Sequence, residues 1–129
     1  MTIRQSITFD SSPESIYETL LSSRLFSDVT GAAAEIAELE GGEFRCFDGQ
    51  ISGRHIELDL NRRIVQSWRV SAWEEGVYST VTFALGGSDG STTVQLEQTG
   101  YPEGARDHLD SGWHKMYWEP LRTYLSRGE

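Results

Sequence analysis

A dipeptide in the middle of the chain, Asp48-Gly49, restricts the fold more than any other feature of the sequence. Both residues tolerate the positive φ angles of a tight β-hairpin turn, and β-forming residues flank the pair on either side. A two-residue loop at this point would pair Cys46 with Ile51 across two antiparallel strands. The stretch 41–69 is therefore predicted to form three strands, with this turn between the first two.

The apolar residues after this turn change from one face of the strand to the other. They shift from an odd-numbered position, Ile51, to the even-numbered positions Ile56, Leu58 and Leu60. A regular strand alternates its side chains between two faces, so it cannot bury both sets on one side. We therefore expect a β-bulge near Gly53–His55 that directs the second apolar set into the core.

The remaining sequence predicts further strands and two helical regions. Alternating apolar residues predict strands at 2–10, 32–39, 64–70, 77–85 and 92–99, in addition to the hairpin at 44–60. Ser12 is a good N-cap, and Pro13 fits the first position of a helix. A second short helix is expected at residues 24–29.

The C-terminal region predicts one long amphipathic helix at residues 105–126. Its apolar stripe consists of Leu109, Trp113, Met116, Tyr117, Leu121 and Tyr124. Pro120 should bend the helix near residues 116–119. The order of one strand, one or two helices, six strands and a long helix predicts an α+β domain over residues 1–129. A curved antiparallel sheet would then wrap around the last helix.

Charge and cysteine content exclude several classes of function. Twenty acidic residues against eleven basic ones give a net charge of −9, which argues against nucleic acid or an anionic membrane as the partner. A single cysteine, Cys46, cannot form a disulfide within the chain. No apolar leader is visible at the N-terminus, so we expect a cytoplasmic protein.

The central stretch, together with later parts of the chain, resembles a known family. The resemblance covers nearly the whole chain and rests on Gly41-Gly42-x-Phe44, Phe47-Asp48-Gly49, Ile51-x-Gly53, Glu57-Leu58, Arg63-Ile64-Val65-x-x-Trp68-Arg69, Trp73-x-Glu75-Gly76-x-Tyr78-x-Thr80-x-Thr82, Gln98-Thr99-Gly100 and Gly112-Trp113. These residues resemble the domain that forms the C-terminal half of the activator of the heat-shock protein 90 ATPase, and that also occurs alone in bacterial proteins. The resemblance implies a helix-grip (START-like, SRPBCC) fold, which agrees with the α+β arrangement.

The resemblance also implies a function, which is that of a noncatalytic binding domain linked to a chaperone of the heat-shock protein 90 type and to the stress response. In the full activator a separate N-terminal domain contributes much of the chaperone contact, and 129 residues leave no room for it. ATPase activation is therefore not implied. Other helix-grip proteins carry or sense small lipophilic ligands, and some are cyclases or hydrolases, so both remain alternatives.

No catalytic residue, metal ligand or cofactor site is expected. The motifs HExxH, G-x-S-x-G, Cys-x-x-Cys and GxGxxG are absent from the sequence. His55 is placed on a strand, and His108 and His114 point in different directions on an ideal helix. The spacing of Asp110 and His114 is more typical of a surface pair than of a catalytic one.

Two groups of residues are candidates for binding. A cavity for a lipophilic ligand would be lined by Phe26, Trp68, Trp73, Tyr78, Gly112, Trp113 and Tyr117. A glycine inside a helix, such as Gly112, is unfavourable by up to about 1 kcal/mol and is typical of a close approach by ligand or backbone. Alternatively, Trp68 and Trp113 fill the core, and Gly112 lets a neighbouring element pack tightly.

The second group would bind a protein partner. It consists of Arg45, Arg54, Arg69 and Trp118, with His55 on the same polar strand face. Trp118 lies about 130° from the middle of the helical apolar stripe at 100° per residue. An exposed tryptophan beside arginines is typical of an interface. Packing of Trp118 on the edge of the sheet is the alternative.

Overall fold

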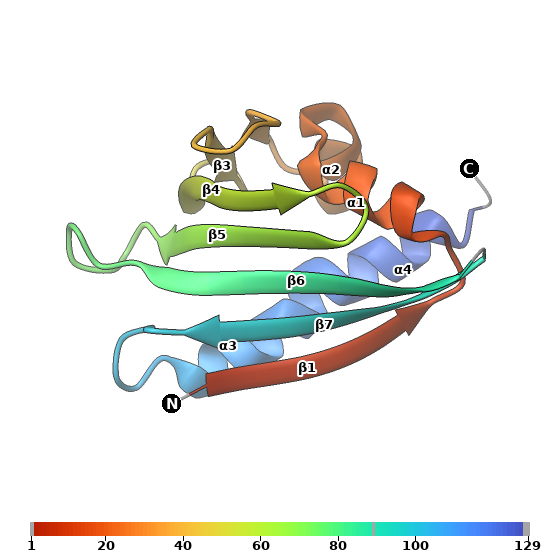
Figure 1. Ribbon diagram of the computed structural model, residues 1–129. Coiled ribbons are helices and arrows are strands. Elements are labelled where there is room, and N and C mark those ends of the chain that lie inside the picture. Colours follow the sequence, from red (N-terminus) through yellow and green to blue (C-terminus); the bar gives the residue numbers. More distant parts are fainter. Residues whose placement is uncertain (1, 89, 128–129) are drawn as a thin grey trace.

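The computed structural model describes residues 2–88 and 90–127. One strand is followed by two short helices, six more strands and a C-terminal helical region (Figure 1). The elements are β1 (Thr2–Phe9), α1 (Pro13–Leu21), α2 (Ser23–Thr30), β2 (Glu35–Ile36), β3 (Glu43–Cys46), β4 (Ile51–Asp59), β5 (Arg63–Val70), β6 (Ser79–Ser88), β7 (Ser91–Thr99), α3 (Arg106–Gly112), the π-helix η1 (Trp113–Trp118) and α4 (Glu119–Leu125). The predicted strand at 32–39 is confined to the two residues of β2.

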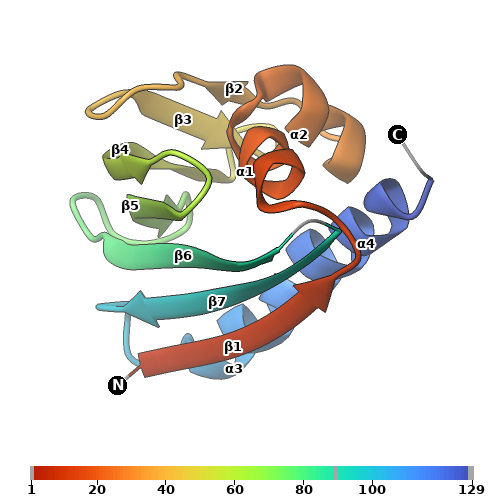
Figure 2. The same ribbon diagram turned by 45° about the vertical axis from the view of Figure 1, so that its right-hand side comes forward.

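The seven strands form one antiparallel sheet in the order β1-β7-β6-β5-β4-β3-β2. The helices lie on one face of this sheet, and the C-terminal helical region crosses it diagonally (Figures 1 and 2). The core fills the space between that face and the helices. The predicted α+β arrangement, with a sheet that grips a C-terminal helix, is confirmed.

The predicted register of the central hairpin is also confirmed. Cys46 pairs with Ile51, and Ser12 caps α1 by accepting a hydrogen bond from the backbone N–H of Ser15. The strand ladder stops at the Cys46–Ile51 pair, so residues 47–50 form the turn. Asp48 within this turn has a φ of 57°. The register of β3 against β4 is therefore as predicted, but the loop is four residues long instead of the predicted two.

The β-bulge lies slightly later than predicted. The register of β4 against β5 shifts between His55 and Glu57, which leaves Ile56 as the extra residue. Ile56 and Leu60 are 54% and 72% exposed, so the prediction that they face the core is wrong. Residue 58 is the member of the even-numbered set that packs against the core, because the shift places it opposite buried Ile64.

Gly53 is not part of the bulge but allows neighbouring strands to approach each other closely. A Cβ atom at this position would collide with the backbone carbonyl of Ser67 on β5 and would touch the ring of Phe44 on β3. The pairing of β3, β4 and β5 at this point therefore requires a residue without a side chain.

The C-terminal helical region widens into a π-helix before Pro120. The backbone N–H of Glu119 bonds to the carbonyl of His114, five residues earlier, and Pro120 falls in the first turn of α4. This wider turn rotates Trp118 into the core, where it is 2% exposed, and leaves Met116 42% exposed. The helix is irregular where a bend was predicted, but the assignment of Met116 to the buried stripe is wrong.

A polar side chain on the inner face of β1 holds Trp118 in place. The indole N–H of Trp118 donates to Gln5 Oε1 at 2.6 Å. The amide of Gln5 in turn donates to the backbone carbonyl and to Oδ1 of Asp110, both at 2.9 Å. Gln5 therefore links the first strand to two turns of the C-terminal helical region.

The same helical region also covers the outer edge of β1. Arg106 Nη1 donates to the backbone carbonyl of Thr2 at 2.9 Å, and Arg122 Nη1 donates to that of Thr8 at 3.1 Å. Both carbonyls belong to the strand at the end of the sheet. The two arginines therefore satisfy backbone groups that no neighbouring strand of the described chain reaches.

Candidate functional site

A groove opens between the sheet and the first half of the C-terminal helical region. Its volume is about 300 Å³. β4 and β5 provide one wall through Ile51, Trp68 and Val70, and the turn before β4 adds Phe47 and Gln50. The other wall comes from α3 and η1 and consists of His108, Leu109, Ser111, Gly112, Trp113, Lys115, Met116 and Tyr117. The groove is thus mainly apolar, with a few polar groups.

Four of the seven residues predicted to line a ligand cavity meet in this groove. They are Trp68, Gly112, Trp113 and Tyr117. The sequence pattern missed the part of the wall that Phe47, Ile51 and Val70 contribute, although the hairpin register already placed Ile51 on the inner face.

The other three predicted residues lie elsewhere. Phe26 packs behind the groove, with its ring 5.5 Å from that of Tyr117. Trp73 packs on Trp68 at a ring distance of 5.9 Å. Tyr78 is 49% exposed and lies under the guanidinium of Arg69 at 5.7 Å. Phe26 and Trp73 therefore pack against residues of the groove wall, and Tyr78 lies apart from it.

Hydrogen bonds fix the aromatic wall. The indole N–H of Trp113 donates to Gln98 Oε1 at 2.8 Å, and the amide of Gln98 donates to Ser79 Oγ at 3.0 Å. The indole N–H of Trp68 donates to the Tyr117 hydroxyl at 3.5 Å. Burial raises the pKa of Tyr117, with a smaller contribution from Cys46, so the hydroxyl stays neutral. The groove is therefore preformed and uncharged at its base.

Gly112 leaves room in the groove wall. A Cβ atom at this helical position would meet no other atom within 4 Å, apart from its own helix backbone. The interpretation that Gly112 allows a neighbouring element to pack tightly is therefore wrong. The absence of a side chain at Gly112 instead leaves open space at this part of the groove wall.

We expect Gly112→Ala to raise the free energy of unfolding by up to about 1 kcal/mol, because alanine is the better helix former and nothing obstructs its methyl group. Urea unfolding followed by circular dichroism would measure the change. A loss of stability would contradict the open space described at this position.

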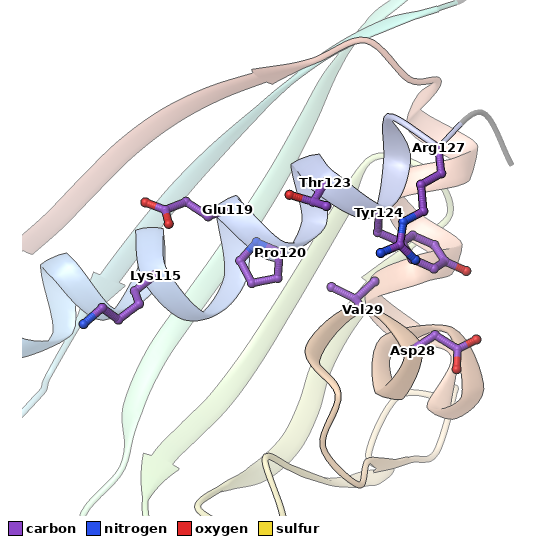
Figure 3. Close-up of a pocket in the computed structure, with 8 residues that line it drawn as sticks. All are labelled: Asp28, Val29, Lys115, Glu119, Pro120, Thr123, Tyr124 and Arg127. Carbon is purple, nitrogen blue, oxygen red and sulfur yellow. The ribbon is translucent and has the colours of Figure 1, made fainter.

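A second hollow lies between α2 and the end of the C-terminal helical region (Figure 3). Its volume is about 260 Å³. Val29 points toward Pro120 and Tyr124, whereas the amino group of Lys115 points away from Arg127. The charged groups around this hollow do not converge on a common point.

The described residues contain no set of three or more His, Cys, Asp or Glu side chains arranged to hold a metal ion. Asp110 binds Gln5, and His108 and His114 are exposed. Burial raises the pKa of Cys46 to about 12, which keeps the thiol protonated and unreactive. No helix in residues 2–88 and 90–127 is long and apolar enough to cross a membrane.

His55 lies in the core, so its predicted place on the arginine-bearing strand face is wrong. It is 1% exposed, stacks on Phe44 at 5.3 Å, and neither ring nitrogen has a hydrogen-bond partner in the described chain. The alternation before the bulge directs it inward with Gly53. Burial lowers the pKa of this imidazole, because the apolar surroundings disfavour its charged form.

The lowered pKa of His55 predicts that the domain loses stability in mild acid. Below the ordinary histidine pKa of about 6.5 the unfolded chain binds a proton that the folded chain resists, so the free energy of unfolding falls as the pH falls. We expect His55→Phe to remove this part of the pH dependence in urea unfolding between about pH 7 and pH 5. Exposed His108, replaced by Gln, is the matched control. An unchanged slope in His55→Phe would contradict the prediction.

The arginines predicted to bind a partner share the outer face of the sheet. Arg45 and Arg54 are exposed, and Arg54 forms an ion pair with Glu43 at 2.7 Å. Arg69 Nη2 donates to the backbone carbonyl of Trp73 at 2.6 Å. The prediction that Trp118 lies exposed beside them is wrong, because the π-helix turns it into the core.

The sequence profile of the family described as "Activator of Hsp90 ATPase homolog 1-like protein" matches residues 10–126. The activator of 90 kDa heat shock protein ATPase homolog 1 of Homo sapiens is 31% identical over 121 residues, which are 94% of this chain and 36% of the human protein. Homolog 2 of Mus musculus is 32% identical over 117 residues, or 91% of this chain and 35% of the mouse protein. The chain thus spans about a third of the length of these curated relatives.

Two solved structures have the same fold. The crystal structure of an HSP90 activator from Plasmodium falciparum superimposes with a TM-score of 0.93 at 23% identity, and covers 98% of this chain and 96% of its own. The solution structure of the Aha1 dimer from Colwellia psychrerythraea gives a TM-score of 0.80 at 18% identity, and covers 95% of this chain and 93% of its own.

Proposed function

Because the chain belongs to the family of Activator of Hsp90 ATPase homolog 1-like proteins, we propose that it is a noncatalytic binding domain whose partner is a protein of the heat-shock protein 90 chaperone type. The observation that carries this proposal is the family match, which extends over residues 10–126 and hence over every described helix and strand after β1. The curated relatives are named as activators of the ATPase of a 90 kDa heat shock protein. Stimulation of ATP turnover is not part of the proposal, since the match covers only about a third of those relatives.

The surface available for such a partner is the outer face of the sheet. The described helices pack on the opposite face (Figures 1 and 2), so this face is open to a protein that docks flat against it. Arg45, Arg54 and Arg69 lie on it. Arginine is enriched at protein interfaces, because its planar guanidinium makes several hydrogen bonds at once.

Binding to the chaperone of the host organism tests this function directly. The purified domain should bind the intact chaperone in isothermal titration calorimetry, and the affinity should not require a substrate or cofactor. The chaperone's ATP turnover, measured in the same mixtures, would show separately whether binding alters it. Absence of binding to the chaperone in all of its nucleotide states would contradict the proposal.

A second candidate function is supported by the groove between the sheet and the helix. A cavity of about 300 Å³ with Trp68, Trp113 and Tyr117 in its walls has the size and lining of a site for a small lipophilic ligand. Native mass spectrometry of protein purified from its own host would detect a retained small molecule. Gly112→Phe should fill the groove and abolish that retention, whereas Asp107→Phe, on the exposed side of α3 and outside both hollows, should not.

A further inference from the structure

Two arginines and a serine form a row on the outer face at one end of the sheet. Arg45 on β3 pairs with Ser52 on β4, and Ser52 pairs with Arg69 on β5. Side chains alternate along each strand, and the neighbours Cys46 and Trp68 are buried on the inner face, so the row faces outward. Two strand spacings, or about 10 Å, separate the two arginine backbones.

The charges of these two arginines are not neutralised within the described chain. Neither Arg45 nor Arg69 forms an ion pair with a described carboxylate, whereas Arg54 in the adjacent row is paired with Glu43. The chain as a whole carries a net charge of −9 and has twenty acidic residues. Two guanidinium groups in one row of the sheet are therefore available to an acidic partner.

The side chain of Arg69 is held in place before any partner arrives. Its Nη2 group donates to the backbone carbonyls of Trp73 at 2.6 Å and Glu74 at 3.3 Å, and its guanidinium lies 5.7 Å from the ring of Tyr78. Nε is shielded from solvent without a hydrogen-bond partner in the described chain. An arginine fixed in this way loses little conformational freedom on binding an anion.

Arg45 extends toward the same end of the sheet. Its Nη2 atom lies 3.5 Å from the position that a Cβ of Gly49 would occupy, so its guanidinium lies over the turn at residues 47–50. The guanidinium of Arg69 lies at the turn that follows β5. The hydroxyl of Ser52 lies between the two strands that carry them and offers a further hydrogen-bond donor.

We propose that Arg45, Ser52 and Arg69 bind carboxylate side chains of an acidic segment in a partner protein. The proposal rests on the protein-binding function proposed above and names the chemistry of the partner. The backbones of the two arginines are about 10 Å apart, which is close to the rise of about 9.3 Å over three residues of a polyproline II segment, in which residues i and i+3 lie on the same side. Two carboxylates three positions apart in such a segment therefore match the two arginines better than one compact phosphate does. Exposed Tyr78 borders the site and offers an apolar contact.

A peptide experiment tests this site independently of the chaperone. The probe is a fluorescent peptide with glutamates at positions i and i+3, and its counterpart has glutamines there. Fluorescence anisotropy should show binding of the glutamate peptide, and Arg45→Glu should weaken it by about tenfold or more, since close charge pairs at interfaces are strongly coupled. Arg69→Gln should weaken it as well. Arg63→Glu is the matched control, because Arg63 lies on the same face of β5 near its other end.

The possible outcomes distinguish a failure of the proposed carboxylate-binding site from a failure of the proposed function. Equal binding of the glutamate and glutamine peptides, or loss of binding in Arg63→Glu equal to that in Arg45→Glu, would overturn the site. A phosphoserine peptide that binds while the glutamate peptide does not would also overturn it. If the chaperone binds the wild type and Arg45→Glu equally, the site fails while the proposed function stands.

Discussion

Replacing Trp118 with alanine should lower the free energy of unfolding by about 3 to 5 kcal/mol, the range for removal of a buried aromatic side chain. Trp118 is 2% exposed and packs between Phe9 and Phe83, with ring distances of 6.2 Å to each. The truncation would also deprive Gln5 Oε1 of its indole donor. Since small domains are stable by about 5 to 15 kcal/mol, the variant should lose much of its stability.

Met116→Ala is the matched control for this experiment. Met116 is two residues away in the same π-helix but 42% exposed, so its loss should cost about 1 kcal/mol or less. Urea unfolding followed by far-ultraviolet circular dichroism would compare the two variants. A cost for Trp118→Ala no larger than that for Met116→Ala would mean that Trp118 lies at the surface.

Gly53→Ala should be the most damaging of the glycine-to-alanine changes considered, with a cost at or above the upper end of the range of about 1 to 3 kcal/mol that is typical of overpacking. The new methyl group would collide with the backbone carbonyl of Ser67 and with the ring of Phe44. Backbone cannot turn aside as a flexible side chain can, so β4 and β5 would have to separate.

The same substitution at Gly112 provides the comparison, because it adds an identical methyl group where nothing obstructs it. Thermal unfolding of both variants should therefore give shifts of opposite sign relative to the wild type. Equal shifts would contradict the account of Gly53 as a position of close strand approach.

The parts of the fold that follow from local chemistry could be predicted from the sequence. Asp48-Gly49 determines the register of its hairpin, because few other dipeptides suit that turn. Ser12 and Pro13 mark the start of α1 in the same way. The shift of the apolar pattern from Ile51 to Leu58 correctly indicated that a bulge must intervene.

Features that depend on tertiary packing could not be predicted. The position of the bulge is ambiguous in the sequence, because nothing there indicates that the polar side chain of His55 is buried without a hydrogen-bond partner in the described chain. The helical projection used for Trp118 assumes 100° per residue, and the π-helix does not obey it. The groove was predicted only in part, because its wall combines residues of the central turn with residues more than fifty positions later.

Arg106 and Arg122 have a consequence for behaviour at high protein concentration. The end strand of a sheet offers free backbone groups to any strand that approaches it, and such contacts are a common start of aggregation. In this chain the two arginines occupy the carbonyls near both ends of β1, so an incoming strand would have to displace them before it could pair along the full edge. In addition to filling the core, the C-terminal helical region thus hinders edge-to-edge strand pairing between copies of the chain at β1.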